Sequence, residues 1–344
     1  MNKKFLTIII PMCNMEKYIE QCLSSLVIDR GMEHMEVLVV NDGSTDQSPD
    51  IACHYAQRYP QTFRVINKEN GHYGSCINRG LTEAQGKFVR ILDADDFYDR
   101  HHLADFLDYL STITDVDMVY TDFCLVSESG KTIKTVRHKR LSGRIYGTKH
   151  LFPHLHINMH SVTYRTQMLR DIHYRQTEGI AYTDQEWIFQ PMASVERWVY
   201  YPRVIYHYRI GRSGQSVSPE QVVRCISQEI QGMMGMVKLY ENLRRTLSED
   251  AVTYLRSRLS TRGKVIFKRF LLYHYDALSS HMNDLINMDE EICHLSPDTY
   301  TLLGQLSYHI LGFKYRFVHK WRTHGYNPML PGLRYRRRKD AIKG

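Results

Sequence analysis

The stretch KFVRILDADD, residues 87–96, joins a short apolar run to a cluster of three carboxylates. Residues 87–92 have the length and apolar content of a buried strand. An earlier stretch, EVLVVND at 36–42, has the same order, with an apolar run followed by an acid. The sequence therefore predicts two strands whose carboxyl ends each carry acidic side chains, Asp42 on one and Asp93 to Asp96 on the other.

Strands and helical patterns alternate on either side of these two stretches. LTIII at 6–10 and FRVIN at 63–67 are further predicted strands, and YIEQCLSSL at 18–26 repeats apolar side chains at the spacing of one helix face. Such alternation is typical of βα units around a parallel sheet. We expect an α/β fold with a mostly parallel sheet flanked by helices, followed by a smaller helical C-terminal region.

The residue pattern changes twice in the second half of the chain. From Met118 the pattern becomes short strands with glycine-bearing turns, then a helix around Asp184 to Met192 and the strand-like YYPRVIYHYR at 200–209. Residues 220–312 have long stretches with the 3.6-residue period of helices. We therefore predict a sheet domain at 1–218, a helical domain at 219–312 and a basic, aromatic tail at 313–344.

The positive charge of the chain is concentrated at its end. The 344 residues include 45 Lys and Arg against 37 Asp and Glu, a net charge of +8, and 43% are hydrophobic. Ten of the basic residues and one acid lie in the tail, so the other residues carry 35 basic and 36 acidic side chains. This composition excludes a disordered, collagen-like or small disulfide-rich protein.

Cysteine spacing and apolar run length exclude several further classes. Seven cysteines, an odd number with no C-x-x-C pair, indicate neither a disulfide framework nor a zinc site and favour a reducing compartment. The longest apolar candidate, residues 302–313, is broken by polar residues and falls short of the about 18 residues that span a bilayer. We expect a cytoplasmic protein without a transmembrane segment.

The acidic residues are predicted to lie where an α/β sheet binds ligands. Ligands of open α/β sheets bind beyond the carboxyl ends of the strands. Carboxylates crowded within four residues repel one another unless a cation or hydrogen-bond donors lie among them, which favours a hard divalent ion. The alternative is a solvated acidic turn that caps the helix near His101.

Six blocks, in this order, resemble the family 2 glycosyltransferases, which have the GT-A fold. They are IIIPMCNMEKYIEQCLSSL, VVNDGSTDQS, NGHYGSCINRGL, A-x-G-K-F-V-x-I-LDADD, YTDQEW and YHYRIGRSGQSVS, and together they cover about residues 5–218. The resemblance implies that this segment is a nucleotide-sugar-binding catalytic domain. It also implies an inverting transferase of the bacterial surface polysaccharide type that uses a nucleotide diphosphate sugar and a divalent metal, Mg²⁺ or Mn²⁺.

The resemblance assigns roles to individual positions. Asp184 matches the catalytic base, although such a residue can also cap the helix that it begins. Asp93 and Asp95 would hold the metal, with Asp95 the preferred direct ligand. The donor-binding positions would be Pro11, Asp42, Arg79, Asp93, Asp95, Arg209, Arg212 and Ser216. Among these, Asp42 would bind the base of the nucleotide, and the last three belong to the loop that closes on the diphosphate.

Candidates for the acceptor site are His160, Tyr164 and Glu186. The first two lie in the block HINMHSVTYRT, where a packed strand is an equally good interpretation, and Glu186 is an alternative base. Cys13 and Thr183 depart from the family pattern, which often has an aromatic residue and a glutamate at these positions.

The expected partners are a nucleotide diphosphate sugar, with a UDP-sugar favoured, and a glycan or lipid-linked acceptor. The tail mixes Lys and Arg with aromatic residues, a composition that binds anionic membrane surfaces. It would hold the enzyme peripherally at the inner face of the cell membrane; nucleic acid is not an expected partner. Two other hypotheses are a non-catalytic lipid- or nucleic-acid-binding protein that uses the tail, and a sugar nucleotidyltransferase. The latter would need a glycine-rich basic loop, which PMCNMEKY after the first strand does not provide.

Overall fold

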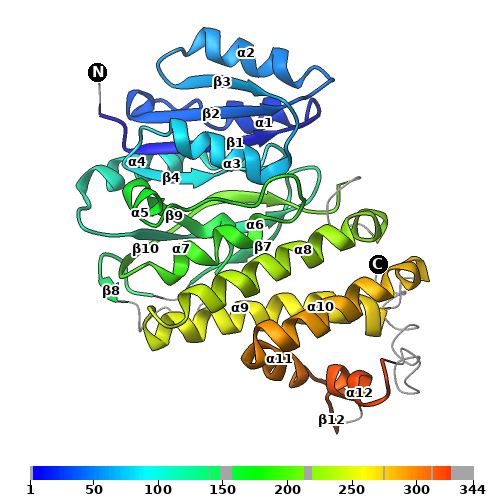
Figure 1. The fold of residues 1–344 in the computed structure, drawn as a ribbon. Helices are drawn as coiled ribbons and strands as arrows, with labels where there is room; N and C mark the ends of the chain where they lie inside the picture. Colours follow the sequence, from blue (N-terminus) through cyan, green and yellow to red (C-terminus); the bar gives the residue numbers. More distant parts are fainter. Residues whose placement is uncertain are drawn as a thin grey trace. The chain divides into compact units, whose positions relative to one another are not determined.

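The computed structural model of the chain divides into two compact units, residues Met1–Gln215 and Ser216–Gly344 (Figure 1). It describes residues 3–138, 140–147, 157–212, 219–273, 276–310 and 313–326. None of the helices in these ranges combines the length and the apolar content that crossing a bilayer needs.

Four parallel strands form the first half of the sheet in the N-terminal unit, as the sequence predicts. Their order is β3 (Phe63–Lys68), β2 (Met35–Asp42), β1 (Leu6–Met12) and β4 (Phe88–Ile91). The continuous apolar runs of β1 and β2 are explained by burial on both faces, which is the usual state of a parallel strand.

Helices cover the two faces of these strands. Ile8 and Ile10 share a core with α1 (Ile19–Ser24), α2 (Ser48–Arg58) and α4 (Arg100–Thr112), whereas Ile9 faces α3 (His72–Glu83). The approach of α3 is so close that a Cβ atom at Gly80 would lie 2.6 Å from Ile9. A glycine is therefore required where α3 crosses β1.

The second half of the sheet is mixed. Strand β9 (Val162–Arg165) is antiparallel to both β4 and β6 (Met118–Val126), and β6 runs parallel to β10 (Arg197–Arg209). Three short strands complete this half by antiparallel pairing: β5 (Phe97–Tyr98) and β8 (Ile145–Gly147) with β10, and β7 (Thr132–Val136) with β6. Between these strands lie two short elements, a 3-10 turn at Met159–Ser161 and helix α5 (Thr166–Asp171).

The single helix predicted around Asp184 to Met192 is wrong in its length. The structure has two short helices instead, α6 (Asp184–Trp187) and α7 (Gln190–Ala193). Pro191 accounts for the interruption, because its nitrogen has no hydrogen to donate to the Trp187 carbonyl and its ring would clash with that carbonyl; it lies in the first turn of α7, where proline is tolerated.

The C-terminal unit is mainly helical. It contains α8 (Pro219–Leu243), α9 (Glu249–Lys268), α10 (Met282–Leu295), α11 (Pro297–Gly304) and α12 (Phe317–Thr323), with a small hairpin of β11 (Tyr308–Ile310) and β12 (Phe313–Tyr315). Among its core residues is a fully buried carboxylate, Glu229, which pairs with Arg262 at 2.8 Å and with Arg269.

The first part of the segment predicted as a tail is folded into this unit. Phe317, Val318 and Trp321 of α12 are fully buried, and Trp321 packs edge to face on Phe267 of α9. These aromatic side chains therefore stabilise the unit and do not face solvent. Residues 327–344 lie outside the described residues.

The pair of Asp289 and Arg322 attaches α12 to α10 and gives a stability prediction. Arg322 donates two hydrogen bonds to the fully buried Asp289 carboxylate, at 2.8 and 2.6 Å. Asp289→Asn leaves the guanidinium without a counter-charge, so we expect it to lower the free energy of unfolding by about 3 kcal/mol in urea titrations followed by circular dichroism. The matched control is Glu291→Gln on the same helix, whose exposed pair with Lys238 should contribute less than about 1 kcal/mol. Equal effects of the two substitutions would contradict this account of α12.

Candidate functional site

Asp42 lies at the carboxyl end of β2, where the parallel strands expose their ends. Its carboxylate is nearly buried and accepts hydrogen bonds from the Lys68 ammonium at 2.7 Å and the Gly71 N–H at 2.9 Å. Pro11, the second-last residue of β1, pairs in register with Val40 and so lies at the same edge. These contacts fix Asp42 between the end of β3 and the start of α3.

Three of the six described residues other than glycine that have positive φ lie in the loops of this edge. Asn14 after β1, His72 at the start of α3 and Tyr182 before α6 all have positive φ, at 53°, 64° and 64°. Residues other than glycine adopt this conformation only where the surrounding structure imposes it, and such positions cluster at functional sites.

The carboxylate cluster after β4 is held by hydroxyl groups from two other elements. Asp93 accepts a hydrogen bond from the Tyr73 hydroxyl of α3 at 2.8 Å. Asp96 is buried and accepts bonds from the Tyr206 hydroxyl and the Arg209 N–H, both at 2.7 Å. Burial, followed by the charge of Asp95, raises the pKa of Asp93 to about 7 and that of Asp96 well above its usual range.

Asp95 is paired with an arginine from the loop after β10. The Arg212 Nε donates to its carboxylate, and the Arg209 Nε donates to its backbone carbonyl at 2.8 Å. Arg209 is itself buried, with further hydrogen bonds to the Glu128 carbonyl and, at 2.6 Å, to Gln21. Arg209 therefore positions the loop, and Arg212 is the cation at the Asp95 carboxylate.

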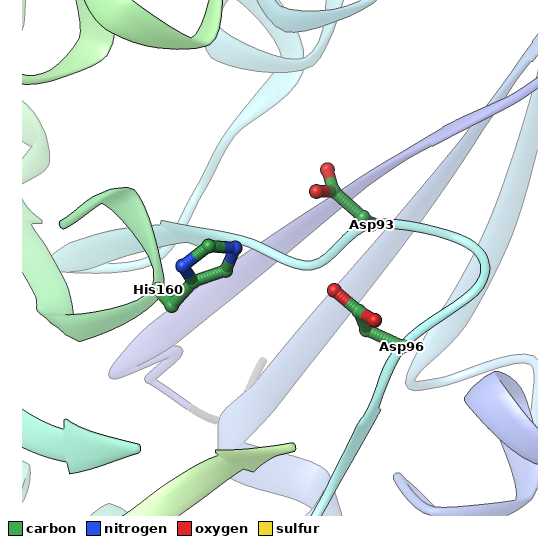
Figure 2. A group of neighbouring side chains, drawn as sticks. All are labelled: Asp93, Asp96 and His160. Carbon is green, nitrogen blue, oxygen red and sulfur yellow. The ribbon is translucent and has the colours of Figure 1, made fainter. Parts of the chain in front are cut away.

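His160 points toward the two carboxylates of Asp93 and Asp96 (Figure 2). One ligand atom from each of these three residues lies within 4.8 Å of the others. The ring stacks on Tyr208, with the two centroids 4.2 Å apart, and its buried Nδ1 has no hydrogen-bond partner among the described residues. Burial, followed by the charge of Arg90, lowers the pKa of His160 to about 3, so the imidazole is neutral and able to bind a metal.

Asp184 is positioned by a loop that is attached to α3. At Gly74 a Cβ atom would lie 2.0 Å from the Thr177 carbonyl, and Asn78 exchanges two hydrogen bonds with the backbone of Gln176, at 2.9 and 2.8 Å. The Glu186 carboxylate then accepts bonds from the Thr177 N–H at 2.7 Å and hydroxyl at 2.8 Å. This brings Asp184, at the first position of α6, near enough to Asp93 for its charge to contribute to the raised pKa of that residue.

The structure does not bring every predicted residue to this edge. Tyr164 is fully buried, donates to the Trp187 carbonyl at 3.0 Å and belongs to the core. Glu186 is occupied in the Thr177 contacts described above. Ser216 lies outside the described residues.

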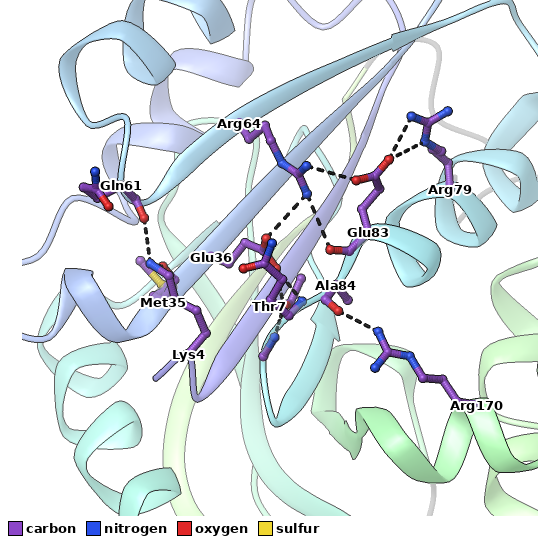
Figure 3. A network of polar contacts seen from close by, with 12 residues as sticks. Lys4, Thr7, Met35, Glu36, Gln61, Arg64, Arg79, Glu83, Ala84 and Arg170 are labelled. Carbon is purple, nitrogen blue, oxygen red and sulfur yellow. Dashed lines mark hydrogen bonds and ion pairs between the residues drawn. The ribbon is translucent and has the colours of Figure 1, made fainter. Parts of the chain in front are cut away.

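Arg79 lies on α3 but is directed toward the other end of the sheet. It pairs with Glu83 at 2.8 Å, and Glu83 pairs at 3.0 Å with Arg64, the second residue of β3 (Figure 3). Seven residues of helix separate Arg79 from His72 at the carboxyl edge, a rise of about 10 Å. The structure therefore places Arg79 in a network at the amino ends of the strands, away from the carboxylate cluster.

The sequence reasoning missed two tyrosines that organise the cluster, Tyr73 and Tyr206. Tyr206 also accepts a hydrogen bond from the Asp93 N–H at 3.1 Å, so it joins the backbone of Asp93 to the carboxylate of Asp96. A signal for it exists in YHYR at 206–209, where alternate residues of a strand share a face. Tyr73 had no comparable signal.

The donor set at this edge fits a hard divalent ion. Carboxylates that are held close together by neutral hydroxyls are stabilised by a cation, and the neutral imidazole of His160 beside them offers one softer ligand. The arginine at Asp95 supplies positive charge for an anionic ligand at the same place. The edge can therefore bind a metal and an anion together.

Comparisons with known proteins agree with this arrangement. The family model described as Glycosyl transferase family 2 matches residues 7–172. EpsH of Bacillus subtilis, described as a glycosyltransferase, is 35% identical over 128 residues, which are 37% of this chain and 36% of EpsH. The minor teichoic acid biosynthesis protein GgaB of the same organism is 25% identical over 212 residues, which are 61% of this chain and 23% of GgaB. The chain thus spans about a third or less of the length of these two relatives.

A solved structure extends the similarity of fold to most of the chain. Residues 1–349 of S. aureus TarS, crystallised in complex with UDP-GlcNAc, superpose with a TM-score of 0.62 and 18% identity, over 93% of this chain and 92% of that one. The predicted α/β fold of the GT-A type is thereby confirmed. The matched segment contains Asp42, Asp93, Asp95 and His160, all at the carboxyl edge of the sheet. Residues 7–172, just under half of the chain, therefore match glycosyl transferase family 2.

Proposed function

We propose that this chain transfers a sugar from a nucleotide diphosphate sugar to a hydroxyl group of a glycan or lipid-linked acceptor, with inversion at the anomeric carbon. The observation that carries the proposal is the group of Asp93, Asp96 and His160, with Asp95 in the same loop, at the carboxyl edge of a sheet that matches family 2. A single displacement needs a stabilised leaving group on one face of the sugar and a base on the other. The cluster and Asp184 would supply these two functions.

The donor would bind along the edge formed by β1, β2 and β4. Asp42 and Pro11 would contact the nucleoside, and Asp93 the ribose. Arg212, which pairs with Asp95, is close to the place of the diphosphate and would bind it, while the buried Arg209 keeps the loop in position. A UDP-sugar is the favoured donor, because TarS, which shares the fold, was crystallised with UDP-GlcNAc.

The metal would be held by Asp95 and Asp93, with His160 as a third ligand. When bound, it would neutralise the charge that develops on the departing diphosphate. Mg²⁺ prefers oxygen ligands alone, whereas a set that includes an imidazole is better suited to Mn²⁺. We therefore propose Mn²⁺ as the more effective ion.

Asp184 would accept the proton of the attacking hydroxyl. Asp184 is the first residue of α6, and Trp187, the last residue of the same helix, is fully buried. The carboxylate is therefore carried on a well-packed element. The Gln185 amide donates to its Oδ2 at 2.8 Å, which orients the carboxylate. The carboxylate is partly exposed, so an acceptor hydroxyl could reach it and hand over its proton there.

The acceptor and the place of action follow from the family type and from charge. Relatives such as GgaB support an acceptor in surface polysaccharide synthesis, as a glycan or a lipid-linked precursor. The basic residues of 327–344 would then hold the enzyme at the inner face of the cell membrane.

Thermal unfolding with a panel of donors tests the proposal. We expect one class of nucleotide diphosphate sugar, at about a hundred times its Kd, to raise Tm by about 5–10 °C when Mn²⁺ is present. EDTA should abolish the shift, and Mg²⁺ should give a smaller one. The corresponding nucleoside monophosphate is the control and should give little shift. A panel of UDP- and GDP-sugars that leaves Tm unchanged with either metal would contradict the proposal.

A further inference from the structure

A second strongly basic surface lies within the sheet unit, outside the site and outside the tail. Residues 131–147, KTIKTVRHKRLSGRIYG, contain six Lys and Arg and no Asp or Glu. They include β7 on one side of β6 and β8 on one side of β10, together with the link between them. We call this segment the basic strap.

The inner side chains of the basic strap fix it to the sheet. Tyr146 stacks on the buried Trp198 of β10, with centroids 4.6 Å apart, and its hydroxyl accepts a hydrogen bond from the Leu141 N–H at 2.9 Å. The His138 N–H donates to Asp122 of β6 at 2.9 Å, and its ring lies 4.3 Å from that of Tyr120. The outward side chains are thus presented from a fixed backbone.

Apolar and cationic side chains are both exposed along the basic strap. Ile133, Leu141 and Ile145 are 57%, 66% and 48% exposed and are three of the four large hydrophobic side chains that the described residues leave exposed. Four exposed cations accompany them, and none makes an ion pair with a described residue; they are Lys131, Lys134, Arg137 and Arg144. Unpaired cations attract an anionic partner, and exposed aliphatic side chains among them favour one that can also bury apolar surface.

We propose that the basic strap binds the surface of an anionic lipid bilayer. At the boundary between headgroups and acyl chains, Leu141 and Ile145 would leave water while the cations contact lipid phosphates, and both contributions favour binding. A soluble polyanion would use the cations but would offer no apolar phase for the aliphatic side chains. The combination of the two kinds of side chain is therefore the reason to choose the bilayer.

The basic strap begins next to the candidate site. Glu128, three residues before Lys131, accepts a hydrogen bond from the Tyr18 hydroxyl at 3.0 Å, and its carbonyl accepts one from Arg209. A bilayer bound to the basic strap would therefore lie close to the carboxylate edge. An acceptor anchored in that bilayer would need to extend only a short way to reach the site.

Vesicle flotation with the full chain tests this inference without any donor, so its outcome is independent of the proposed function. The vesicles contain phosphatidylcholine alone or with one third phosphatidylglycerol. A charge variant carries Lys134→Gln, Arg137→Gln and Arg144→Gln, and an apolar variant carries Leu141→Ser and Ile145→Ser. We expect the first to bind anionic vesicles at least about tenfold more weakly than the wild type, and the second about fivefold more weakly.

The matched control neutralises three exposed cations elsewhere on the sheet unit, by Arg58→Gln, Arg100→Gln and Arg203→Gln, and should bind like the wild type. All substituted side chains are exposed, so unchanged Tm values verify folding. Wild-type affinity in both strap variants, with loss of binding only on truncation after Tyr326, would overturn the inference in favour of the tail. An effect of the charge variant alone, with displacement by soluble polyphosphate, would overturn it in favour of a polyanion. Absence of wild-type binding to anionic vesicles would also overturn it.

Discussion

Asp184→Asn is expected to lower the kcat of sugar transfer about a thousandfold and to leave donor affinity unchanged. Asparagine keeps the shape of the side chain and can still accept the hydrogen bond from Gln185, but it cannot take up the proton of the attacking hydroxyl. General base catalysis typically contributes between about a hundredfold and ten-thousandfold to the rate. Steady-state kinetics at saturating donor, together with calorimetric titration of the donor, separate the two quantities.

Glu186→Gln is the matched control, because it changes the other carboxylate of the same short helix. Both Glu186 oxygens accept hydrogen bonds from Thr177, so the substitution should lower stability and change kcat far less than Asp184→Asn does. The opposite result, with a large kcat loss in Glu186→Gln at intact stability and an active Asp184→Asn enzyme, would assign the base to Glu186.

Asp95→Asn should weaken donor binding in the presence of Mn²⁺ by about a hundredfold or more. Asp95 is the carboxylate of the cluster that pairs with Arg212, so it lies where the metal, the diphosphate and the loop after β10 are proposed to meet. Removing its charge would take away a proposed metal ligand, and losses even in the supporting residues of a metal site cost about 10–100-fold in affinity. Calorimetric titration of Mn²⁺ and of donor, separately and together, measures the effect.

Asp99→Asn is the control for this substitution. Asp99 follows the same loop but caps α4, where its carboxylate accepts from the His102 N–H at 2.9 Å. Asparagine caps a helix as well as aspartate does, so donor and metal affinity should not change. If Asp95→Asn binds metal and donor with wild-type affinity while His160→Ala loses affinity, the metal site would instead be assigned to Asp93, Asp96 and His160.

The parts of the fold that could be predicted are those that depend on local sequence. The strands at 6–10, 36–40, 63–67 and 87–92 are confirmed. Those at 6–10 and 36–40 are buried on both faces and so are continuously apolar, whereas the strand at 63–67 lies at the edge of the sheet and is only partly buried. The antiparallel insertion of β9 between β4 and β6 could not be predicted in this way. It depends on pairing between segments about 75 and 45 residues apart in the sequence, which no local pattern reveals.

The candidate site likewise has residues whose position could be predicted from the sequence and residues whose position could not. Asp42 and Asp93 to Asp96 follow strands directly, so their position at the carboxyl edge could be inferred from topology. Arg79 could not be placed, because its direction depends on how α3 turns as it crosses the sheet. The YHYR stretch places Tyr206 and Tyr208 on one face of a strand, but the contacts of Tyr206 with Asp93 and Asp96 exist only once β10 lies beside the loop after β4.

The tail shows that amino-acid composition alone does not predict which side chains are buried. Ten cations and several aromatic residues predict one exposed, membrane-binding segment, yet Phe317 and Trp321 are core residues of the C-terminal unit. Exposed aliphatic side chains with unpaired cations occur instead on the basic strap, in the middle of the chain. Charge is visible in the sequence, whereas burial of the aromatic side chains depends on the packing of α12 against α9 and α10.

Release of nucleotide diphosphate from a nucleotide sugar in the presence of Mn²⁺ tests the central claim most directly. Without acceptor, water can replace the hydroxyl nucleophile, so the wild type should release nucleotide diphosphate slowly from the donor identified by thermal unfolding. Asp95→Ala should release no nucleotide diphosphate above the uncatalysed rate, and EDTA should abolish the release by the wild type. Equal release by the two proteins, or no release by the wild type from any UDP- or GDP-sugar, would contradict the assignment of a metal-dependent sugar transferase to this edge of the sheet.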